Sequence, residues 1–540
     1  MINVLGSIFL KYRFTILSFL YFGILAFWMR VGLPDSRFFF NLIYAVLNAV
    51  ILQSLIILIS KIPKFSWVFA FVLSLLVTAD ITHKLVYGTL LTLGGISSMF
   101  ESNTSEAGDF FLLYIKDWLP AILLTTSIIM LSVHEARSIT IRKKYIVGFL
   151  VIALSLNFAS IFLSRGEGER VTAYEEFNTA PDLFIQTSMS VRIPLGVNSF
   201  ISTLSYWNEM RKFREEATLP KVLMPGLSYS QKNVSPQTIF LVIGESSLRT
   251  HYSLYGYDLP TTPFLDSLNT AGNLLYYNAF SVAPITREAL RMSLSFASPL
   301  DVAPFTKNEN VVTMANLAGY ESYWFSNQDK VGMHDSFIGL LASYAKTSKF
   351  YRFEKDDIQL LKDVSEQYDL SKKQIFFIHL KGSHLDYKDK YDQVDQEALG
   401  IVEGREETIE YDRSIHHTDR VLDGLDRLIR ISEKDSISSV IVYYSDHGEI
   451  INKGHGIMKM DSDQFKIPFV IIPYNQKADI STIMEGFLVG GIFNSNSISY
   501  LMAFLSGYNI DEQLLRKSRN EALYYHHVDG CNYKIRDLQK

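Results

Sequence analysis

Acidic side chains and histidines follow three apolar runs of this chain, and each run is typical of a buried strand. Glu245 comes directly after the first run, and Asp446 and His447 come directly after the second. His384 lies just beyond the third. Buried parallel strands read as continuous apolar runs, and ligand sites of open α/β sheets lie outside the carboxyl ends of the strands, so these side chains are expected to meet at one edge. Zinc takes nitrogen and oxygen ligands and needs no cysteine, so the pattern predicts a zinc site.

Thr286 is the candidate nucleophile for such a site. It follows the β-like, proline-containing segment Phe280–Ile285 and precedes a helical run that begins near Arg287. Backbone N–H groups and the helix dipole at a helix N-terminus favour the negative charge of a bound phosphate. Zinc coordination is one way to lower the pKa of a threonine hydroxyl and activate it. The alternative is an ordinary helix N-cap, a position where threonine is common.

The elements that must position these residues alternate between apolar strands and helix-like segments from Pro236 to about Gly507. This alternation is typical of an α/β sheet. The predicted strands are Ile239–Ile243, Ser322–Phe325, Ile375–Leu380, Ser439–Tyr444 and Phe469–Ile472. Polar residues interrupt the late apolar stretch Phe487–Tyr508. We therefore expect core helices there and not a membrane span.

Long apolar runs precede this domain. They are Phe14–Trp28, Phe38–Ser60, Phe65–Thr82, Trp118–Val133 and Tyr145–Ser164. Each is about long enough to cross the ~30 Å hydrocarbon core of a bilayer at ~1.5 Å per helical residue, so five spans are predicted. Long buried helices of a soluble protein are the alternative, but the runs carry almost no charge. Asp80 and His83, near the end of the third run, are expected at the membrane interface, where charge is tolerated.

Basic residues between the runs predict the orientation of the spans. One side carries Lys11, Arg13, Lys61, Lys64, Arg137, Arg142, Lys143 and Lys144, and the other carries Arg30, Arg37, Lys84 and Lys116. By the positive-inside rule the N-terminus is cytoplasmic, and an odd number of spans then places the chain after about residue 165 outside the cytoplasm. No small-residue cleavage site follows the first run, so it is not expected to be a removable signal.

Composition fits a membrane segment joined to a globular domain. The chain has 540 residues, 48% of them hydrophobic, and its net charge of −5 gives no reason to expect nucleic acid as a partner. Cys531 is the single cysteine, so an intramolecular disulfide and a thiolate metal cluster are both excluded. Residues 166–235 mix charged stretches with amphipathic ones such as Phe200–Met210. A linker with membrane-surface helices is expected there, and a solvated connector is the alternative.

These motifs resemble those of the phosphoethanolamine transferases, which are multi-pass inner-membrane enzymes of Gram-negative bacteria with an exported domain of the alkaline phosphatase/sulfatase type. The matching residues, in order, are Gly244-Glu245-Ser246, Thr286, Gly382-Ser383-His384, Tyr444–Glu449, and His455 followed by Gln464–Pro468. Five predicted spans before the domain fit as well, so the resemblance covers nearly the whole chain. No single motif is specific, but the ordered set is.

The resemblance implies that the chain is divided into three parts. Residues 1–165 would form a transmembrane domain of five helices, with a periplasmic loop for the donor lipid at about 88–116. Residues 166–235 would be the linker with membrane-surface helices. Residues 236–540 would form a periplasmic, sulfatase-like catalytic domain with a mixed, mostly parallel sheet between helices.

Carried over by position, the resemblance also implies roles. The first zinc would be held by Glu245, Thr286, Asp446 and His447, and Thr286 would receive the phosphoethanolamine group. His384 and His455 would bind a second zinc or the phosphoryl group, so one or two zinc ions are expected. Satisfied structural histidines are the alternative for that pair. His416 and His417 are interpreted as structural.

Further substrate contacts are implied by the same resemblance. Ser98, Ser102 and Glu106 have the spacing i, i+4, i+8 and would share one helical face in the donor-lipid loop. Glu106 could pair with the ammonium of an ethanolamine headgroup, and an ordinary surface carboxylate is the alternative. Asn327 and Lys330, in and after the family-like segment Tyr323–Gln328, would be further substrate-binding residues.

The resemblance implies a monomeric transferase that moves phosphoethanolamine from phosphatidylethanolamine, through a covalent threonine intermediate, to an envelope acceptor. Lipid A or a core sugar of lipopolysaccharide is the expected acceptor, and a periplasmic glucan or a protein stays open. A phosphoglycerol transferase acting on a glucan is the main alternative, since it shares the spans, the threonine and the metal site. A sulfatase is disfavoured because Ser281–Ile285 lacks its Cys/Ser-x-Pro-x-Arg motif. A non-enzymatic scaffold is disfavoured because every ligand position holds a competent residue.

Overall fold

The computed structural model describes the chain except for residues 1–10, 32–37, 89–90, 102–103, 164–192, 232, 234, 329–335, 352–355, 433–436, 457–460, 476–478, 527–530 and 535–540. The side chains of residues 98, 101–113, 117, 160–163, 526 and 531 also lie outside the described part. The described chain divides into two compact units, the first ending at Glu209 and the second beginning at Met210. The division into three parts inferred from the sequence stays a prediction.

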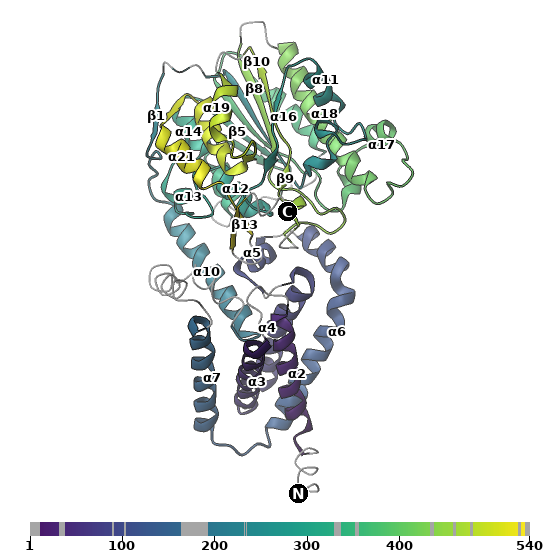
Figure 1. The fold of residues 1–540 in the computed structure, drawn as a ribbon, viewed down its shortest axis with the longest axis vertical. Helices are drawn as coiled ribbons and strands as arrows, with labels where there is room; N and C mark the ends of the chain where they lie inside the picture. Colours follow the sequence, from purple (N-terminus) through teal and green to yellow (C-terminus); the bar gives the residue numbers. More distant parts are fainter. Residues whose placement is uncertain are drawn as a thin grey trace. The chain divides into compact units, whose positions relative to one another are not determined.

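The first unit consists mainly of long apolar helices (Figure 1). They are α2 (Arg13–Arg30), α3 (Phe38–Ser60), α4 (Ser66–Tyr87), α6 (Thr104–Ala136) and α7 (Lys143–Leu163), with the short α5 (Leu93–Glu101) before α6. Among the described residues, α2, α3, α4 and the Tyr114–Ala136 part of α6 are long and apolar enough to cross a membrane. Four of the five predicted apolar helices are therefore confirmed, and each has the length and composition of a membrane span. The fifth ends at Ser164, outside the described residues, and stays a prediction.

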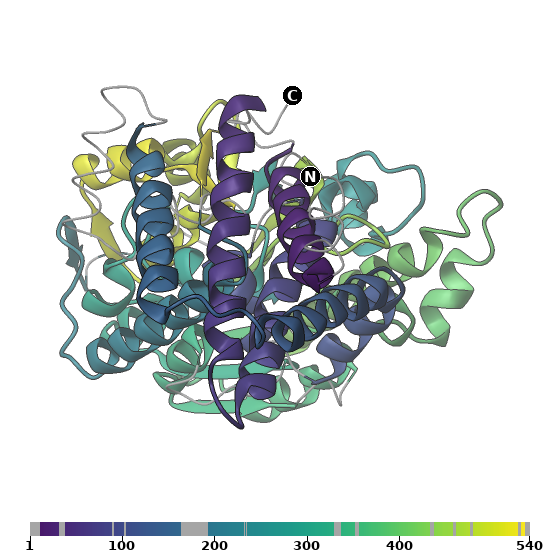
Figure 2. The same cartoon turned by 90° about the horizontal axis from the view of Figure 1, so that it is seen from below.

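Helices α2 and α3 lie side by side in both views (Figures 1 and 2). Small residues face each other in this contact, where a Cβ on Gly23 of α2 would lie at an ordinary van der Waals distance of 3.8 Å from the Cβ of Ala49 in α3. Ala26 and Ala45 are buried in the same cluster. Close van der Waals packing therefore joins these two helices, as is usual where lipid removes the hydrophobic driving force.

Asp80 is fully buried inside the first unit. Its carboxylate accepts hydrogen bonds from the backbone N–H of Gly196 and from Nδ2 of Asn198, both at 2.8 Å. These residues lie at the start of helix α10 (Val197–Ala217). The sequence predicts a charge tolerated at the membrane interface, whereas in the structure hydrogen bonds within the unit compensate the buried carboxylate.

A mixed sheet of seven strands forms the centre of the second unit, in the order β3-β10-β8-β2-β7-β5-β6. Its strands are β3 (Leu275–Tyr276), β10 (Phe469–Tyr474), β8 (Ser439–Ser445), β2 (Thr238–Gly244), β7 (Gln374–His379), β5 (Glu321–Ser326) and β6 (Thr347–Phe350). The five strands from β8 to β6 are parallel, and β10 and β3 are antiparallel additions. The predicted mixed, mostly parallel sheet is confirmed.

Strand β2 lies between β8 and β7 and is buried along its whole length. Alternate side chains point to opposite faces of the sheet. Phe240 and Val242 enter a core cluster that also contains Leu265 of α11 (Pro263–Thr270) and Leu422 of α18 (Ile409–Ser432). Burial on both faces is why these strands appear in the sequence as continuous apolar runs.

Further helices and short strands complete the second unit (Figure 1). The helices are α12 (Thr286–Ser293), α13 (Pro304–Lys307), α14 (Val311–Leu317), α15 (Phe337–Ser343), α16 (Leu360–Gln367), α17 (Gln393–Leu399), α19 (Ile480–Phe487), α20 (Ile498–Leu505) and α21 (Glu512–Asn520). The strands are β1 (Leu227–Tyr229) with β12 (Tyr508–Ile510), β4 (Ala279–Phe280) with β9 (Lys466–Ile467) and β11 (Phe493–Asn494), and β13 (Leu523–His526) with β14 (Cys531–Lys534). Helix α20 is largely buried in this unit, which confirms the prediction of a core helix there.

Candidate metal centre

The carboxyl ends of β2 and β8 bring the two predicted acidic residues together. The strands are parallel neighbours, and their register pairs Gly244 with Ser445. Glu245 and Asp446 are therefore the next residues at the same edge of the sheet. Both side chains are buried, Glu245 with 2% and Asp446 with 0% of its surface exposed.

Two glycines allow the surrounding loops to approach this edge. Gly382 has a φ of +59°, and a Cβ there would lie 2.6 Å from the carbonyl oxygen of Glu245. A Cβ on Gly448 would clash with the carbonyl oxygen of Asp463. A side chain at either position would push apart the loops that carry the predicted ligands, which explains the glycines of both motifs.

Thr286 is the first residue of α12, and its hydroxyl points into the site. Its Oγ1 lies 3.2 Å from Oε2 of Glu245 and 3.2 Å from Nε2 of His447. The N-cap position is occupied by Ile285, which makes no side-chain cap. The alternative of an ordinary threonine N-cap is therefore wrong.

His447 lies between the two carboxylates. Its Nε2 is 3.2 Å from Oε1 of Glu245 and 3.3 Å from Oδ2 of Asp446. Its Nδ1 lies 2.9 Å from the carbonyl oxygen of Gly448, which can only accept, so the ring donates there. When the ring is neutral its lone pair is therefore on Nε2, the nitrogen that faces both carboxylates and the threonine, and when the ring is charged the same nitrogen carries a proton.

The charges of this group are strongly coupled. Burial lowers the pKa of His447, but the carboxylates of Asp446 and Glu245 outweigh it and raise that pKa to about 10. Burial and the charge of Glu245 raise the pKa of Asp446 well above its usual value. Burial also acts to raise the pKa of Glu245, yet the charge of His447 holds it well below its usual range. The two buried carboxylates thus compete for the positive charge of His447.

An unpaired buried oxygen shows what kind of ligand the group suits. Oδ1 of Asp446 accepts hydrogen bonds from the backbone N–H groups of Ser246 and His447. Oδ2 of the same carboxylate is buried and has no hydrogen-bond partner among the residues that the structure describes. Ligand atoms of Glu245, Asp446 and His447 all lie within 4.8 Å of one another. Oxygen and nitrogen donors in this arrangement fit a zinc ion.

His384 and His455 lie next to this group. The ring centroids of His447 and His455 are 4.1 Å apart, and those of His455 and His384 are 5.6 Å apart. Burial lowers the pKa of His455 well below its usual value, and the neighbouring rings of His447 and His384 lower it further. His455 is therefore a neutral imidazole, the form that binds metals.

Of the remaining predicted substrate residues, Asn327 alone has its side chain in the described part of the chain. Ser98, Ser102, Glu106 and Lys330 lie, wholly or in their side chains, outside the described residues. Asn327 is fully buried, and its Nδ2 donates to Oδ1 of Asp357 at 2.8 Å. Asp357 in turn accepts the backbone N–H groups of Lys381 and Gly382. In the structure Asn327 therefore supports the loop that carries His384.

Sequence reasoning overlooked two residues near the histidines. Glu449 is fully buried, and its Oε2 lies 3.0 Å from Nδ1 of His455. Its other oxygen accepts a hydrogen bond from the hydroxyl of Tyr387 at 3.2 Å. The position of Glu449, two residues after His447, was an available signal. Tyr387 gives no signal in the sequence.

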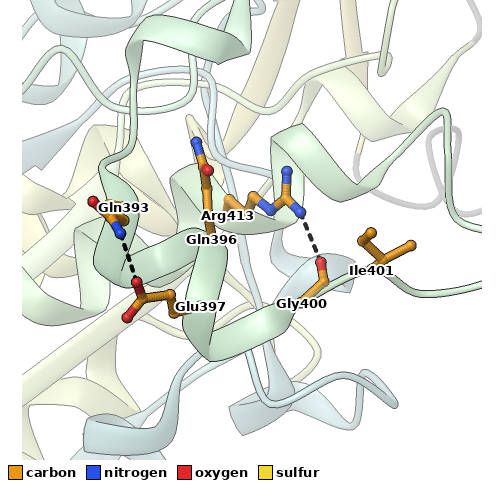
Figure 3. A pocket seen from close by; sticks show the side chains of 6 residues that line it. All are labelled: Gln393, Gln396, Glu397, Gly400, Ile401 and Arg413. Atoms are coloured by element: carbon orange, nitrogen blue, oxygen red, sulfur yellow. Dashed lines mark hydrogen bonds between the residues drawn. The ribbon is translucent and has the colours of Figure 1, made fainter.

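A separate cavity of about 590 Å³ lies beside α17 (Figure 3). It is lined by Gln393, Gln396, Glu397, Gly400, Ile401 and Arg413. Gln393 donates to Glu397, and Arg413 donates to the carbonyl oxygen of Gly400 (Figure 3). These polar groups are bound to one another, and the lining contains no residue of the metal centre.

The chain is similar to known proteins over much of its length. Residues 237–487 match the sulfatase family. Phosphoethanolamine transferase EptC of Escherichia coli strain K12 is 27% identical over 69% of this chain. Phosphoethanolamine transferase OpgE of the same strain is 30% identical over 45% of this chain and 46% of its own length. The chain spans 66% of the length of the EptC relative.

One solved structure covers almost the whole chain. The integral membrane protein lipooligosaccharide phosphoethanolamine transferase A from Neisseria meningitidis has a TM-score of 0.57 and 14% sequence identity. The match covers 95% of this chain and 98% of that one. At this identity the likeness shows the fold, with apolar N-terminal helices followed by a sulfatase-like α/β domain.

Proposed function

We propose that this chain, which matches the sulfatase family over residues 237–487 and is 27% identical to a phosphoethanolamine transferase over 69% of its length, transfers phosphoethanolamine from phosphatidylethanolamine to an envelope acceptor. Lipid A or a core sugar of lipopolysaccharide is the proposed acceptor. The observation that carries the proposal is the Thr286 hydroxyl, which lies 3.2 Å from both Glu245 Oε2 and His447 Nε2 beside the unpaired oxygen of Asp446. Such a group suits an activated nucleophile.

The reaction would proceed in two displacements at phosphorus. Thr286 Oγ1 forms a bond to phosphorus while the bond to the diacylglycerol oxygen breaks, and that oxygen takes up a proton. The acceptor oxygen then loses its proton and forms a bond to phosphorus while the bond from phosphorus to Thr286 Oγ1 breaks, and Oγ1 takes up a proton to restore the hydroxyl. Each step leaves the number of bonds at phosphorus unchanged, and the phosphothreonine is the covalent intermediate.

The residues of this chain have separate tasks in that sequence. Thr286 Oγ1 donates a hydrogen bond to the Glu245 carboxylate, so the threonine proton points at this carboxylate before the hydroxyl is deprotonated. The N-terminus of α12 offers backbone N–H groups to the phosphoryl oxygens. Glu245, Asp446, His447 and Thr286 would hold one zinc ion, and His384 and His455 would serve a second ion or the phosphoryl group. When bound, zinc supplies the positive charge that lowers the pKa of the threonine hydroxyl.

The apolar helices fit a location in the inner membrane with a periplasmic catalytic domain. A cytoplasmic N-terminus, the fifth span, a monomeric state and the three-part division remain part of the proposal. Ser98, Ser102 and Glu106 are proposed to contact the donor headgroup, and Asn327 and Lys330 are proposed as further substrate-binding residues. That the homologues are named as phosphoethanolamine transferases favours this headgroup over phosphoglycerol.

Trapping the intermediate tests the proposal. The full-length protein in detergent would be mixed with phosphatidylethanolamine labelled in the headgroup, quenched in acid, digested and analysed by mass spectrometry. We expect phosphoethanolamine on Thr286, released when acceptor is added. Label on another residue, or labelling from phosphatidylglycerol in place of phosphatidylethanolamine, would contradict the proposal.

A further inference from the structure

The histidines of the metal centre share one feature at Nδ1. Nδ1 of His447 lies 2.9 Å from the carbonyl oxygen of Gly448, and Nδ1 of His384 lies 3.2 Å from the carbonyl oxygen of Leu385. A carbonyl oxygen can only accept a hydrogen bond, so both rings carry a proton on Nδ1. Neutral rings in this tautomer have their lone pair on Nε2.

His455 faces a side chain in the same place. Its Nδ1 lies 3.0 Å from Oε2 of Glu449, a carboxylate with 0% of its surface exposed. The hydroxyl of Ser246 is a more distant neighbour, 3.5 Å from the same nitrogen. Ser246 donates its own proton to Oε1 of Glu245, so towards His455 it too can act as an acceptor. Ionised Glu449 can only accept a hydrogen bond, and Ser246 can accept one as well, so with Glu449 ionised both neighbours favour a proton on Nδ1.

Tyr387 fixes the direction of the hydrogen bonds around Glu449. The hydroxyl oxygen of Tyr387 accepts the backbone N–H of Asn452 at 3.0 Å, which leaves its own proton for Oε1 of Glu449 at 3.2 Å. Glu449 thus accepts from Tyr387 with one oxygen and faces His455 with the other. Asn452 lies in the turn between Glu449 and His455, where the N–H of Gly454 donates to the carbonyl oxygen of Ile450. This turn holds the carboxylate against the ring.

We propose that Glu449 is a positioning residue that keeps the proton of His455 on Nδ1 and presents the Nε2 lone pair to a cation. A ring in this tautomer has no proton on Nε2 and cannot donate a hydrogen bond to a phosphoryl oxygen. Of the two roles open to His455, the geometry therefore points to that of a metal ligand. A carboxylate that holds the far nitrogen of a metal-binding histidine is a common arrangement. The inference rests on the proposed function only in taking the centre to bind zinc.

A double-mutant cycle tests this proposal. The wild-type full-length protein would be compared in detergent with Glu449→Gln, His455→Ala and the double variant. Zinc affinity would be measured by competition with a chelator, and kcat/KM with a small soluble phosphodiester. Glutamine keeps the volume of glutamate and can still hydrogen-bond, so the variant is expected to fold. The thermal unfolding midpoint of each metal-free protein checks this.

If Glu449 acts through His455, substitution of Glu449 changes zinc affinity and kcat/KM only in proteins that retain His455. We expect Glu449→Gln to weaken zinc binding by about tenfold in the wild-type background, the lower end of the effect of losing such a partner. In the His455→Ala background, Glu449→Gln should change zinc affinity and kcat/KM by less than about twofold, since coupled residues are non-additive. Glu403→Gln, an exposed glutamate in another loop, serves as the matched control and should leave both values unchanged.

Two results would overturn the proposal. Equal losses from Glu449→Gln in both backgrounds would show that Glu449 does not act through His455. Unchanged zinc affinity in His455→Ala would show that His455 is not a metal ligand. The zinc measurement needs no substrate, so absence of phosphoethanolamine transfer would contradict the proposed function while the cycle still decides the role of Glu449.

Discussion

Two clusters in the second unit contain the same kinds of side chain and differ in how they are satisfied. One is the metal centre of Glu245, Asp446 and His447, and the other gathers Asp356, Asp392 and His417 around Asp395. Each group of three places its ligand atoms within 4.8 Å of one another. By residue type and spacing alone, either could be taken for a metal site.

In the second cluster both oxygens of the central carboxylate, Asp395, accept hydrogen bonds. Oδ2 of Asp395 accepts hydrogen bonds from Nδ1 of His417 at 2.7 Å and from Nη1 of Arg420 at 2.9 Å. It also accepts the backbone N–H of Asp392 at 2.9 Å. Oδ1 accepts from Nδ1 of His416 at 2.7 Å. His417 reaches Asp356 with its other nitrogen, at 3.0 Å. This agrees with the structural interpretation of His416 and His417.

The metal centre lacks this internal balance. Oδ2 of Asp446 has no hydrogen-bond partner in the described part of the chain, and the two carboxylates share one basic neighbour, His447, at 3.2 and 3.3 Å. A buried carboxylate is expensive unless positive charge or hydrogen bonds satisfy it. An unsatisfied acceptor therefore marks the cluster that is suited to an external cation. The number of acidic residues and histidines does not distinguish the two clusters.

The largest expected effect belongs to Thr286. Thr286→Ala should lower transfer on the order of 10⁴-fold or more, the scale on which removing a catalytic nucleophile acts. Zinc should remain bound, because Glu245, Asp446 and His447 are still present. Headgroup transfer and zinc content of the purified variant measure both outcomes. Thr286→Ser keeps a hydroxyl and is the matched control, which should retain labelling at position 286.

The second prediction separates the clusters by metal content. Asp446→Asn should lose zinc and transfer, because ligand number and charge set metal affinity. The metal-free variant should be at least as stable as the metal-free wild type, because it no longer buries two carboxylates side by side. Elemental analysis and thermal unfolding with a chelator test this pair of effects. Zinc bound at the wild-type level would show that the strand-end argument chose the wrong ligand.

The third prediction is that a substitution in the second cluster lowers stability and leaves the zinc content unchanged. Asp395→Asn should destabilise the protein by about 3–5 kcal/mol, the cost of removing one partner from a buried charge network. Its zinc content should stay at the wild-type level. Thermal unfolding and elemental analysis measure the two effects. Loss of zinc without loss of stability would make the second cluster a metal site and would remove the difference between the two clusters.

Residues that directly follow strands could be placed from the sequence. The runs at 239–243 and 439–444 are apolar because both faces of those strands are buried, and parallel neighbours end at the same edge. Glu245 and Asp446 could thus be predicted to lie together. Pairs such as Tyr387 with Glu449 depend on the path of loops between strands, which has no periodic signal. For Asp80, hydropathy predicted a position near the end of the third apolar run but not the backbone N–H of Gly196 and the side-chain amide of Asn198 that its carboxylate binds.

The fourth prediction concerns pH. Burial lowers the pKa of His417, but Asp356 and Asp395 outweigh it and raise it from 6.5 to about 10. The folded state therefore holds a proton that the unfolded state releases. The resulting stability is fully present below pH 6.5 and is lost as pH rises towards 10, by at most ~1.4 kcal/mol per pH unit.

Comparison of the wild type with His417→Gln isolates this contribution. Thermal unfolding at pH 7 and pH 9 would be measured for both proteins, with Arg420 and both carboxylates left in place. We expect the wild type to lose more stability than the variant over that interval. Parallel pH dependences in the two proteins would show that His417 carries no extra proton and that its contacts with the carboxylates are neutral hydrogen bonds.

The smallest effect is expected at the rim of the second cluster. Asp392 has 35% of its side chain exposed and pairs with Nη1 of Arg420 at 2.6 Å. It also caps α17, since its side chain accepts the backbone N–H groups of Val394 and Asp395. Asparagine caps helices as well as aspartate does, so Asp392→Asn removes only a half-exposed ion pair and should cost less than about 1 kcal/mol. Asp392→Ala loses the cap too and should cost roughly 1 kcal/mol more. Thermal unfolding of the two variants gives the difference. If Asp392→Asn proved as damaging as Asp395→Asn, the charge of Asp392 would matter to stability as much as that of Asp395, and the half-exposed ion pair with Arg420 would not be a minor contribution.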